Sequence, residues 1–211
     1  MASNHSLILF CFCGPAGSGK STICQELVRT DPSLTLSVST TTRAPRGAEQ
    51  EGIDYFFVSE EEFASRVAAG RFIEYATFGG HRYGTEASGL KTVAASGRDV
   101  LLDIDVQGAQ QLKKIFPGQT VTIFVFPPSY SELVSRLRAR GTDTEARIAE
   151  RLRIADLEIA RLLEPGFSDY LLINSERSSA LDSARVVIAA ERQRLDRFDP
   201  RFVGAMVKKS D

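Results

Sequence analysis

The stretch GPAGSGKST, residues 14–22, directly follows the apolar run LILFCFC, residues 7–13. Seven apolar residues without polar alternation are typical of a short strand that is buried on both faces. The segment after the stretch favours a helix that begins near Lys20. A glycine-rich loop between a strand and a helix is typical of a phosphate-binding loop. The pattern G-x-x-x-x-G-K-S/T is matched at Gly14, Gly19, Lys20 and Ser21.

The residue types in this loop are those that phosphate binding requires. Its glycines allow backbone N–H groups to converge on phosphate oxygens, and the following helix presents the positive end of its dipole. Lys20 can reach the β- and γ-phosphates of a nucleoside triphosphate, and the Ser21 hydroxyl can hold the Mg²⁺ that accompanies it. The predicted nucleotide-binding residues are Gly14, Pro15, Ala16, Gly17, Ser18, Gly19, Lys20, Ser21 and Thr22.

Outside the loop, apolar strand patterns alternate with helical patterns along most of the chain. Alternation of this kind predicts an α/β fold, a P-loop NTPase-type parallel sheet with helices on both faces. Residues 36–95 differ, because they are rich in strands and turns and contain a hairpin at Gly79-Gly80. They are predicted to form an inserted small mixed α/β lobe, in which residues 39–55 are a polar loop. Residues 129–163 show a helix, a break and a second helix, and predict a helical lid.

These parts give one domain with three components and a tail. The core is expected at about 7–35, 96–128 and 164–197, and the polar C-terminal tail at 198–211. A chain of 211 residues is long enough for a single domain of this size.

Composition narrows the class of protein. The formal net charge is -1, which argues against a nucleic-acid partner, and the longest apolar run is too short for the roughly 20 residues of a membrane span. Residues 1–6 lack a signal-peptide pattern. The three cysteines, of which Cys11 and Cys13 can pack in the core, do not suggest a disulfide framework. A reducing, cytoplasmic location is therefore expected.

Two carboxylates end the predicted strand DVLLDID, residues 99–105. Asp103 and Asp105 are two positions apart, so their side chains would lie on the same side of that strand. The carboxyl ends of the strands form the edge at which such folds bind ligands. One aspartate could support Mg²⁺ or its waters, and the other could face an acceptor.

The small lobe carries candidate groups for a phosphorylated acceptor. Arg43, Arg46 and Tyr55 could clamp a monophosphate dianion. The Watson–Crick edge of guanine offers two N–H donors, which a carboxylate such as Glu74 can accept, and an O6 acceptor for the hydroxyls of Ser39 and Thr85. Adenine would present an acceptor to the same carboxylate and leave it unpaired.

Two other functions remain open on these residues alone. A kinase of the same fold could act on a different phosphorylated acceptor, although it would not need Glu74 together with Ser39 and Thr85. A non-catalytic module could bind phosphorylated peptides in the same lobe, although such modules typically have a degraded phosphate loop, and here Gly19, Lys20 and Ser21 are intact.

In order and spacing, six segments resemble the guanylate kinase family. The resemblance runs from about Leu7 to Arg197, and the stretch from Ser39 to Tyr55 is its most specific part. The six segments are GPAGSGKST, SVSTTTRAPRGAEQEGIDYFFVS, FIEYATFGGHRYGT, LLDIDVQGAQQLK, RLRARGTDTEARIAERL and INSE.

The resemblance implies roles for individual residues. The GMP phosphate would be held by Arg43, Arg46, Tyr55 and Tyr83. Guanine would be recognised by Ser39, Glu74, Thr85 and Asp103, which leaves Asp105 as a second-sphere group for Mg²⁺. Asn174 would lie near the adenine of ATP. The phosphates would be reached on lid closure by Arg136, Arg140 and Arg151, of which the first two share a helix face.

The implied activity is an ATP:GMP phosphotransferase. It would convert GMP, and also dGMP, to the diphosphate with Mg²⁺·ATP as donor, in purine nucleotide metabolism and GMP recycling. Its partners would be the small molecules ATP and GMP, with no nucleic acid and no membrane, and the chain would be a monomer or a homo-oligomer.

Overall fold

The computed structural model describes residues 6–139, 144–201 and 204. Its core is a five-stranded sheet in which every neighbouring pair of strands is parallel. The strand order across the sheet is β2 (Leu34–Leu36), β7 (Asp99–Asp103), β1 (Leu9–Cys13), β8 (Thr120–Phe126) and β9 (Tyr170–Ile173). The parallel sheet confirms the predicted α/β class. The strand that precedes the glycine-rich loop is central and wholly buried, as its unbroken apolar run predicts.

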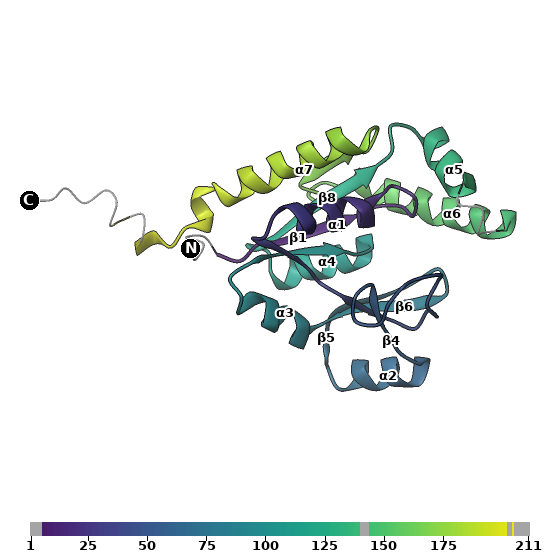
Figure 1. Cartoon of the computed structure of the whole chain (residues 1–211), viewed down its shortest axis with the longest axis horizontal. Coiled ribbons are helices and arrows are strands. Elements are labelled where there is room, and N and C mark those ends of the chain that lie inside the picture. Colours follow the sequence, from purple (N-terminus) through teal and green to yellow (C-terminus); the bar gives the residue numbers. More distant parts are fainter. Residues whose placement is uncertain (1–5, 140–143, 202–203, 205–211) are drawn as a thin grey trace, which may run out of the picture.

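Helices cover both faces of this sheet (Figure 1). Alternate residues of β1 point to opposite faces, so that Phe10 and Phe12 join one buried cluster and Cys11 and Cys13 join the other. The first cluster includes residues of α1 (Lys20–Thr30) and α7 (Arg177–Arg192). The second includes residues of α3 (Ala87–Ala94) and α4 (Val106–Ile115). All three cysteines are free and buried, which confirms the expected core packing of the two on β1.

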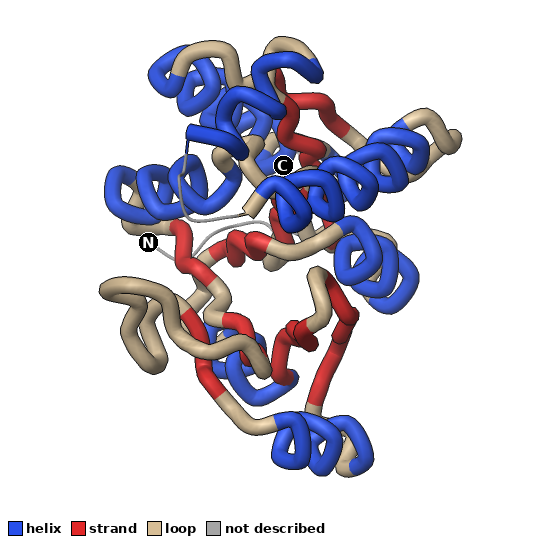
Figure 2. Tube along the Cα trace, turned by 90° about the vertical axis from the view of Figure 1, so that its right-hand side faces the viewer, coloured by secondary structure: helices blue, strands red, loops and turns tan. Residues whose placement is uncertain are grey.

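A second sheet forms a separate layer below the core (Figures 1 and 2). Its order is β4 (Tyr55–Phe57), β3 (Ser39–Thr41), β6 (His81–Glu86) and β5 (Phe72–Phe78), and α2 (Glu60–Ala68) packs at its far side. The prediction that residues 39–55 are all loop is wrong at both ends, because Ser39 begins β3 and Tyr55 begins β4. Residues 39–41 pair with both β4 and β6, since their polar side chains are buried against the neighbouring strands.

Two helices follow β8 and project beyond one end of the core (Figure 1). They are α5 (Tyr130–Ala139) and α6 (Glu145–Leu162), and they share a small buried cluster built on Leu133, Leu137 and Ile148. Ala16 of the glycine-rich loop packs against the same cluster. The loop therefore lies directly beside the two helices. Among the described residues, no helix is long and apolar enough to cross a membrane.

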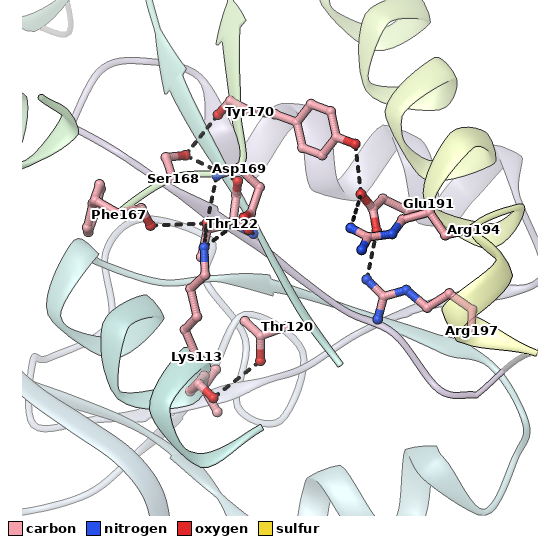
Figure 3. A network of polar contacts seen from close by, with 11 residues as sticks. Lys113, Thr120, Thr122, Phe167, Ser168, Asp169, Tyr170, Glu191, Arg194 and Arg197 are labelled. Atoms are coloured by element: carbon pink, nitrogen blue, oxygen red, sulfur yellow. Dashed lines mark hydrogen bonds and ion pairs between the residues drawn. The ribbon is translucent and has the colours of Figure 1, made fainter. Parts of the chain in front are cut away.

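A polar network connects the amino ends of β8 and β9 to the last turn of α7 and the residues that follow it (Figure 3). The Tyr170 hydroxyl donates to Glu191 at 2.7 Å, and the Arg197 guanidinium donates to the other carboxylate oxygen at 2.7 Å. Arg197 also donates to the Gly118 carbonyl, and its own carbonyl accepts from Ser6. Arg197 belongs to the short 3-10 helix η1 (Leu195–Arg197) that follows α7. Glu191 and Arg197 are only 2% and 5% exposed.

We expect Glu191→Gln to destabilise the fold without affecting the reaction. The substitution leaves the buried Arg197 guanidinium without its counter-charge, a loss of about 3 kcal/mol in the free energy of unfolding. For a chain of this size, the midpoint of thermal unfolding should fall by about 8 °C. Thermal unfolding followed by circular dichroism measures the change. An unchanged midpoint would show that the buried ion pair does not stabilise the fold.

Candidate active site

The glycine-rich loop lies at the carboxyl edge of the central strand. β1 is flanked by β7 on one side and β8 on the other, so the strand order reverses direction at β1. Parallel sheets of this kind usually bind ligands in the crevice at such a point, beyond the carboxyl ends of the strands. The Lys20 ammonium lies over the loop and donates to the carbonyls of Gly14 at 2.6 Å and Pro15 at 3.1 Å. The loop is thus formed around its lysine.

The second half of the loop is held by the residue that follows β9. Gly19, the residue before α1, has a φ of 93°, a conformation that favours glycine. Directly against it, the Asn174 side-chain amide donates to the Ser18 carbonyl at 2.7 Å, and a Cβ at Gly19 would collide with that amide. The backbone carbonyl of Asn174 in turn accepts a hydrogen bond from the Arg136 guanidinium at 2.9 Å. Asn174 therefore contacts the loop directly, and Arg136 contacts Asn174.

Asp103 and Asp105 lie on either side of the end of β7. Asp103 is its last residue, and its carboxylate accepts a hydrogen bond from the Ser21 hydroxyl. Its charge also acts on Tyr55, whose pKa rises to about 12, chiefly because the ring is buried and then because of Asp103. Asp103 therefore lies between the loop serine and the phosphate clamp of the small lobe.

Asp105 lies beyond the strand and caps α4. Its carboxylate accepts from the backbone N–H groups of Gln107 at 2.7 Å and Gly108 at 2.9 Å. A Cβ at Gly108 would collide with the carboxylate of Glu74, so the start of α4 lies close against Glu74. Asp105 therefore lies on the Glu74 side and Asp103 on the Ser21 side.

Glu74 is buried in the middle of β5. It accepts a hydrogen bond from the Thr85 hydroxyl, its cross-strand neighbour on β6, at 2.6 Å. Burial raises the pKa of Glu74 to about 7, the Thr85 hydrogen bond opposes the rise, and the charge of Asp105 adds to it. Glu74 and Thr85, both predicted to recognise guanine, thus lie in direct contact, and burial brings the pKa of the carboxyl group close to neutral pH.

The phosphate clamp is built around Arg43. This side chain is buried, lies over the Tyr55 ring with 5.3 Å between the guanidinium carbon and the ring centroid, and makes two hydrogen bonds to Glu49, at 2.9 and 2.8 Å. Tyr83 packs edge-on against Tyr55. Sequence reasoning missed Glu49, although a carboxylate in the same loop as two arginines could have pointed to it. Its fork-to-fork pairing fixes the orientation of the Arg43 guanidinium.

One cavity joins the loop to the small lobe. It has a volume of about 290 Å³ and lies between the two sheets. It is lined by most of the predicted residues of both sites: Gly14, Ala16, Gly17, Gly19, Lys20, Ser21, Thr22, Ser39, Arg43, Arg46, Tyr55, Glu74, Tyr83, Asp103, Asp105 and Arg151. Pro15, Ser18 and Thr85 are not in its lining, although each belongs to a segment that forms it.

A larger cleft of about 780 Å³ continues from this cavity, between the β5–β6 hairpin and α6. Arg151 on α6 lines both spaces, and so do Arg46 and Tyr83 of the small lobe. Arg151 therefore borders both spaces from the helical segment. Arg136 contacts the donor loop through Asn174 instead. Arg140, the third predicted arginine, lies outside the described residues.

The loop, the buried acid and the arginine clamp on one cavity define a class of protein, the P-loop kinases that act on nucleoside monophosphates. Comparison with known proteins narrows the class. The family profile described as guanylate kinase matches residues 5–191, nearly the whole chain. The chain belongs to the guanylate kinase family.

Individual relatives agree with this assignment. A curated guanylate kinase of Desulfitobacterium hafniense is 42% identical over 204 residues, covering 97% of this chain and 100% of the relative. That of Thermotoga maritima is 42% identical over 189 residues, covering 90% of this chain and 89% of the relative. A crystal structure of guanylate kinase from Anaplasma phagocytophilum has 30% identity and a TM-score of 0.74, covering 93% of this chain and 92% of that one. The chain is an enzyme that phosphorylates GMP to GDP with ATP as the donor.

Proposed function

We propose that GMP occupies the small-lobe end of the 290 Å³ cavity and that the ATP phosphates occupy its loop end. The observation that carries this proposal is that residues of both predicted sites line one continuous space. In this arrangement Arg43, Arg46, Tyr55 and Tyr83 bind the GMP phosphate. Its guanine pairs with Glu74 and accepts a hydrogen bond from the Ser39 hydroxyl, while the Thr85 hydroxyl, which donates to Glu74, orients that carboxylate. Asp105 replaces Asp103 as the second carboxylate near the base, because it lies beside Glu74.

On the donor side, Lys20 and the loop amides bind the β- and γ-phosphates, and Asn174 lies toward the adenine. Ser21 and Asp103 fit a Mg²⁺ that arrives with ATP, because a hydroxyl and a carboxylate supply the oxygen ligands that this ion and its waters prefer. When bound, Mg²⁺ neutralises charge on the β- and γ-oxygens. Lys20 and the arginines stabilise the remaining charge on the transferring group.

We also propose that the chain has three moving parts, with the lobe at about 36–95 and the lid at about 129–163 closing over the core. Closure excludes water, so that the γ-phosphoryl group passes to GMP instead of to solvent. Arg151 lines the cavity from the lid and would reach the phosphates in the closed form, together with Arg136 and Arg140. No general base is required, because a phosphate monoester is largely ionised near neutral pH. Catalysis then rests on positioning and on electrostatic stabilisation.

The affinity for GMP should depend on pH through Glu74. Glu74 accepts from guanine in its carboxylate form, and its pKa is raised to about 7. Below that pH, Glu74 must therefore lose a proton when GMP binds. We expect the KM for GMP to rise about tenfold between about pH 8 and about pH 6, while the KM for ATP changes much less. In Glu74→Gln this dependence should shrink to what the GMP phosphate itself contributes. A KM for GMP that stays flat across this range would contradict the pairing.

Two further expectations stay predictions. The enzyme is expected in a reducing, cytoplasmic location, with which its three free and buried cysteines agree. It is expected to act as a monomer or a homo-oligomer, and to accept dGMP as well as GMP.

A further inference from the structure

A buried glutamate on the lid helix has no place in the reaction as described so far. Glu158 lies on α6 and is only 3% exposed. Its Oε2 atom is buried and has no hydrogen-bond partner within the part of the chain that the structure describes. The residue lines both the 290 Å³ cavity and the 780 Å³ cleft. The unpaired oxygen is therefore beside the space in which the nucleotides bind.

The surroundings of Glu158 are those of the reacting phosphates. Burial raises the pKa of Glu158 to about 7, the charge of Lys20 opposes the rise, and the charge of Asp105 adds to it. Glu158 in turn contributes to the raised pKa of Cys13, the last residue of β1 before the loop. Glu158 thus lines the same cavity as Lys20, close enough for their charges to act on each other.

A second buried glutamate in the chain differs from Glu158 in its contacts. Glu191, on α7, is equally buried, but both of its oxygens are bonded, one to Tyr170 and one to Arg197. An unpaired buried carboxyl destabilises a fold, whether it stays charged or takes up a proton. Buried carboxyl groups without partners occur at functional sites, where activity requires a group that lowers the stability of the fold.

We propose that Glu158 is a positioning residue that accepts a hydrogen bond from the Lys20 ammonium in the closed complex and so holds Lys20 on the phosphates. In the present structure two donors of Lys20 are engaged by the carbonyls of Gly14 and Pro15. An ammonium group has three donors, which allows one to reach a carboxylate when phosphates take the place of loop carbonyls. The inference rests on the proposed contact between Lys20 and the ATP phosphates.

This role couples lid closure to the lysine. Glu158 and Arg151 are two helical turns apart on one face of α6, since seven residues correspond to about two turns. A movement of α6 onto the core therefore brings an arginine to the phosphates and a carboxylate to the lysine in one step. The lysine is then oriented only when both substrates are enclosed.

The test is Glu158→Gln, which keeps the size of the side chain and removes its charge. We expect kcat to fall between about 10- and 100-fold, the effect of displacing a catalytic group by about 1 Å, while the KM for GMP changes less than about threefold. The midpoint of thermal unfolding should equal or exceed that of the wild type, because an unpaired buried carboxyl has been removed. Glu158→Met, a second replacement of similar length, should behave in the same way.

Glu191→Gln is the matched control, a buried glutamate at the other end of the sheet. It should show the opposite pattern, with a lower midpoint and an unchanged kcat. The proposal is overturned if Glu158→Gln keeps a kcat within about threefold of the wild type, or if its kcat falls only together with a lowered midpoint, the result of a structural role. An active Lys20→Met variant would instead overturn the phosphate contact itself, so the two failures are distinguishable.

Discussion

Lys20→Met is expected to abolish phosphoryl transfer while leaving the protein folded. The ammonium is the loop's own positive charge, and the proposal places it on the β- and γ-phosphates, where charge is redistributed in the transition state. We expect kcat to fall by about 100- to 1,000-fold or more, since removal of one such donor costs about 100- to 1,000-fold. Among the described residues, the side chain bonds to the Gly14 and Pro15 carbonyls alone, so the midpoint of thermal unfolding should change by no more than about 3 °C.

The measurement is ADP formation with saturating Mg²⁺·ATP and GMP. Lys91→Met is a suitable control, because Lys91 is an exposed lysine on α3 and does not line the cavity. It should retain the full rate. If the Lys20→Met variant were nearly as active as the wild type, Lys20 would not be a catalytic group, and the loop would serve only to bind the nucleotide.

Glu74→Gln is expected to cause the second large effect, a loss of base selectivity. The carboxylate accepts from two N–H donors of guanine in the proposed complex, whereas an amide offers one acceptor and presents a donor in place of the other. Two bonds to a charged group are worth about 4 kcal/mol together, so kcat/KM for GMP should fall about 1,000-fold. AMP should lose nothing, because the amide can donate to N1 of adenine.

The ratio of kcat/KM for GMP to that for AMP reports this selectivity directly. Glu61→Gln, an exposed glutamate on α2 of the same lobe, provides the control and should keep the wild-type ratio. The KM for ATP should stay within about twofold in both variants. If Glu74→Gln retained the wild-type preference for GMP, guanine would have to be recognised elsewhere in the lobe.

The fold could be predicted from the sequence because its decisive signals are local. The apolar run before Gly14 predicts a central buried strand, and the glycine-rich loop marks the sheet edge at which ligands bind. The segment at Ser39 was predicted as loop because its side chains are polar. It forms an interior strand because it pairs with strands on both sides, which no local pattern records.

The site was predictable by residue type and less so by position. Asp103 and Asp105 have the same spacing that a continuing strand would give, but the strand ends at Asp103 and Asp105 turns to cap α4. Glu49 was missed although its partner Arg43 is only six residues away, because the fold of the loop sets their pairing and no periodic pattern marks it. Glu158 was missed because the packing of α6 on the core places it at the cavity, which periodicity along the chain does not reveal.

The most direct test of the account is ADP formation by the purified protein with Mg²⁺·ATP and each of GMP, AMP, CMP and UMP, alongside a reaction without an acceptor. The account predicts rapid turnover with GMP and only background rates with the other nucleotides and with water. Comparable turnover of AMP, or none with GMP, would contradict the assignment of the acceptor and the reading of guanine by Glu74.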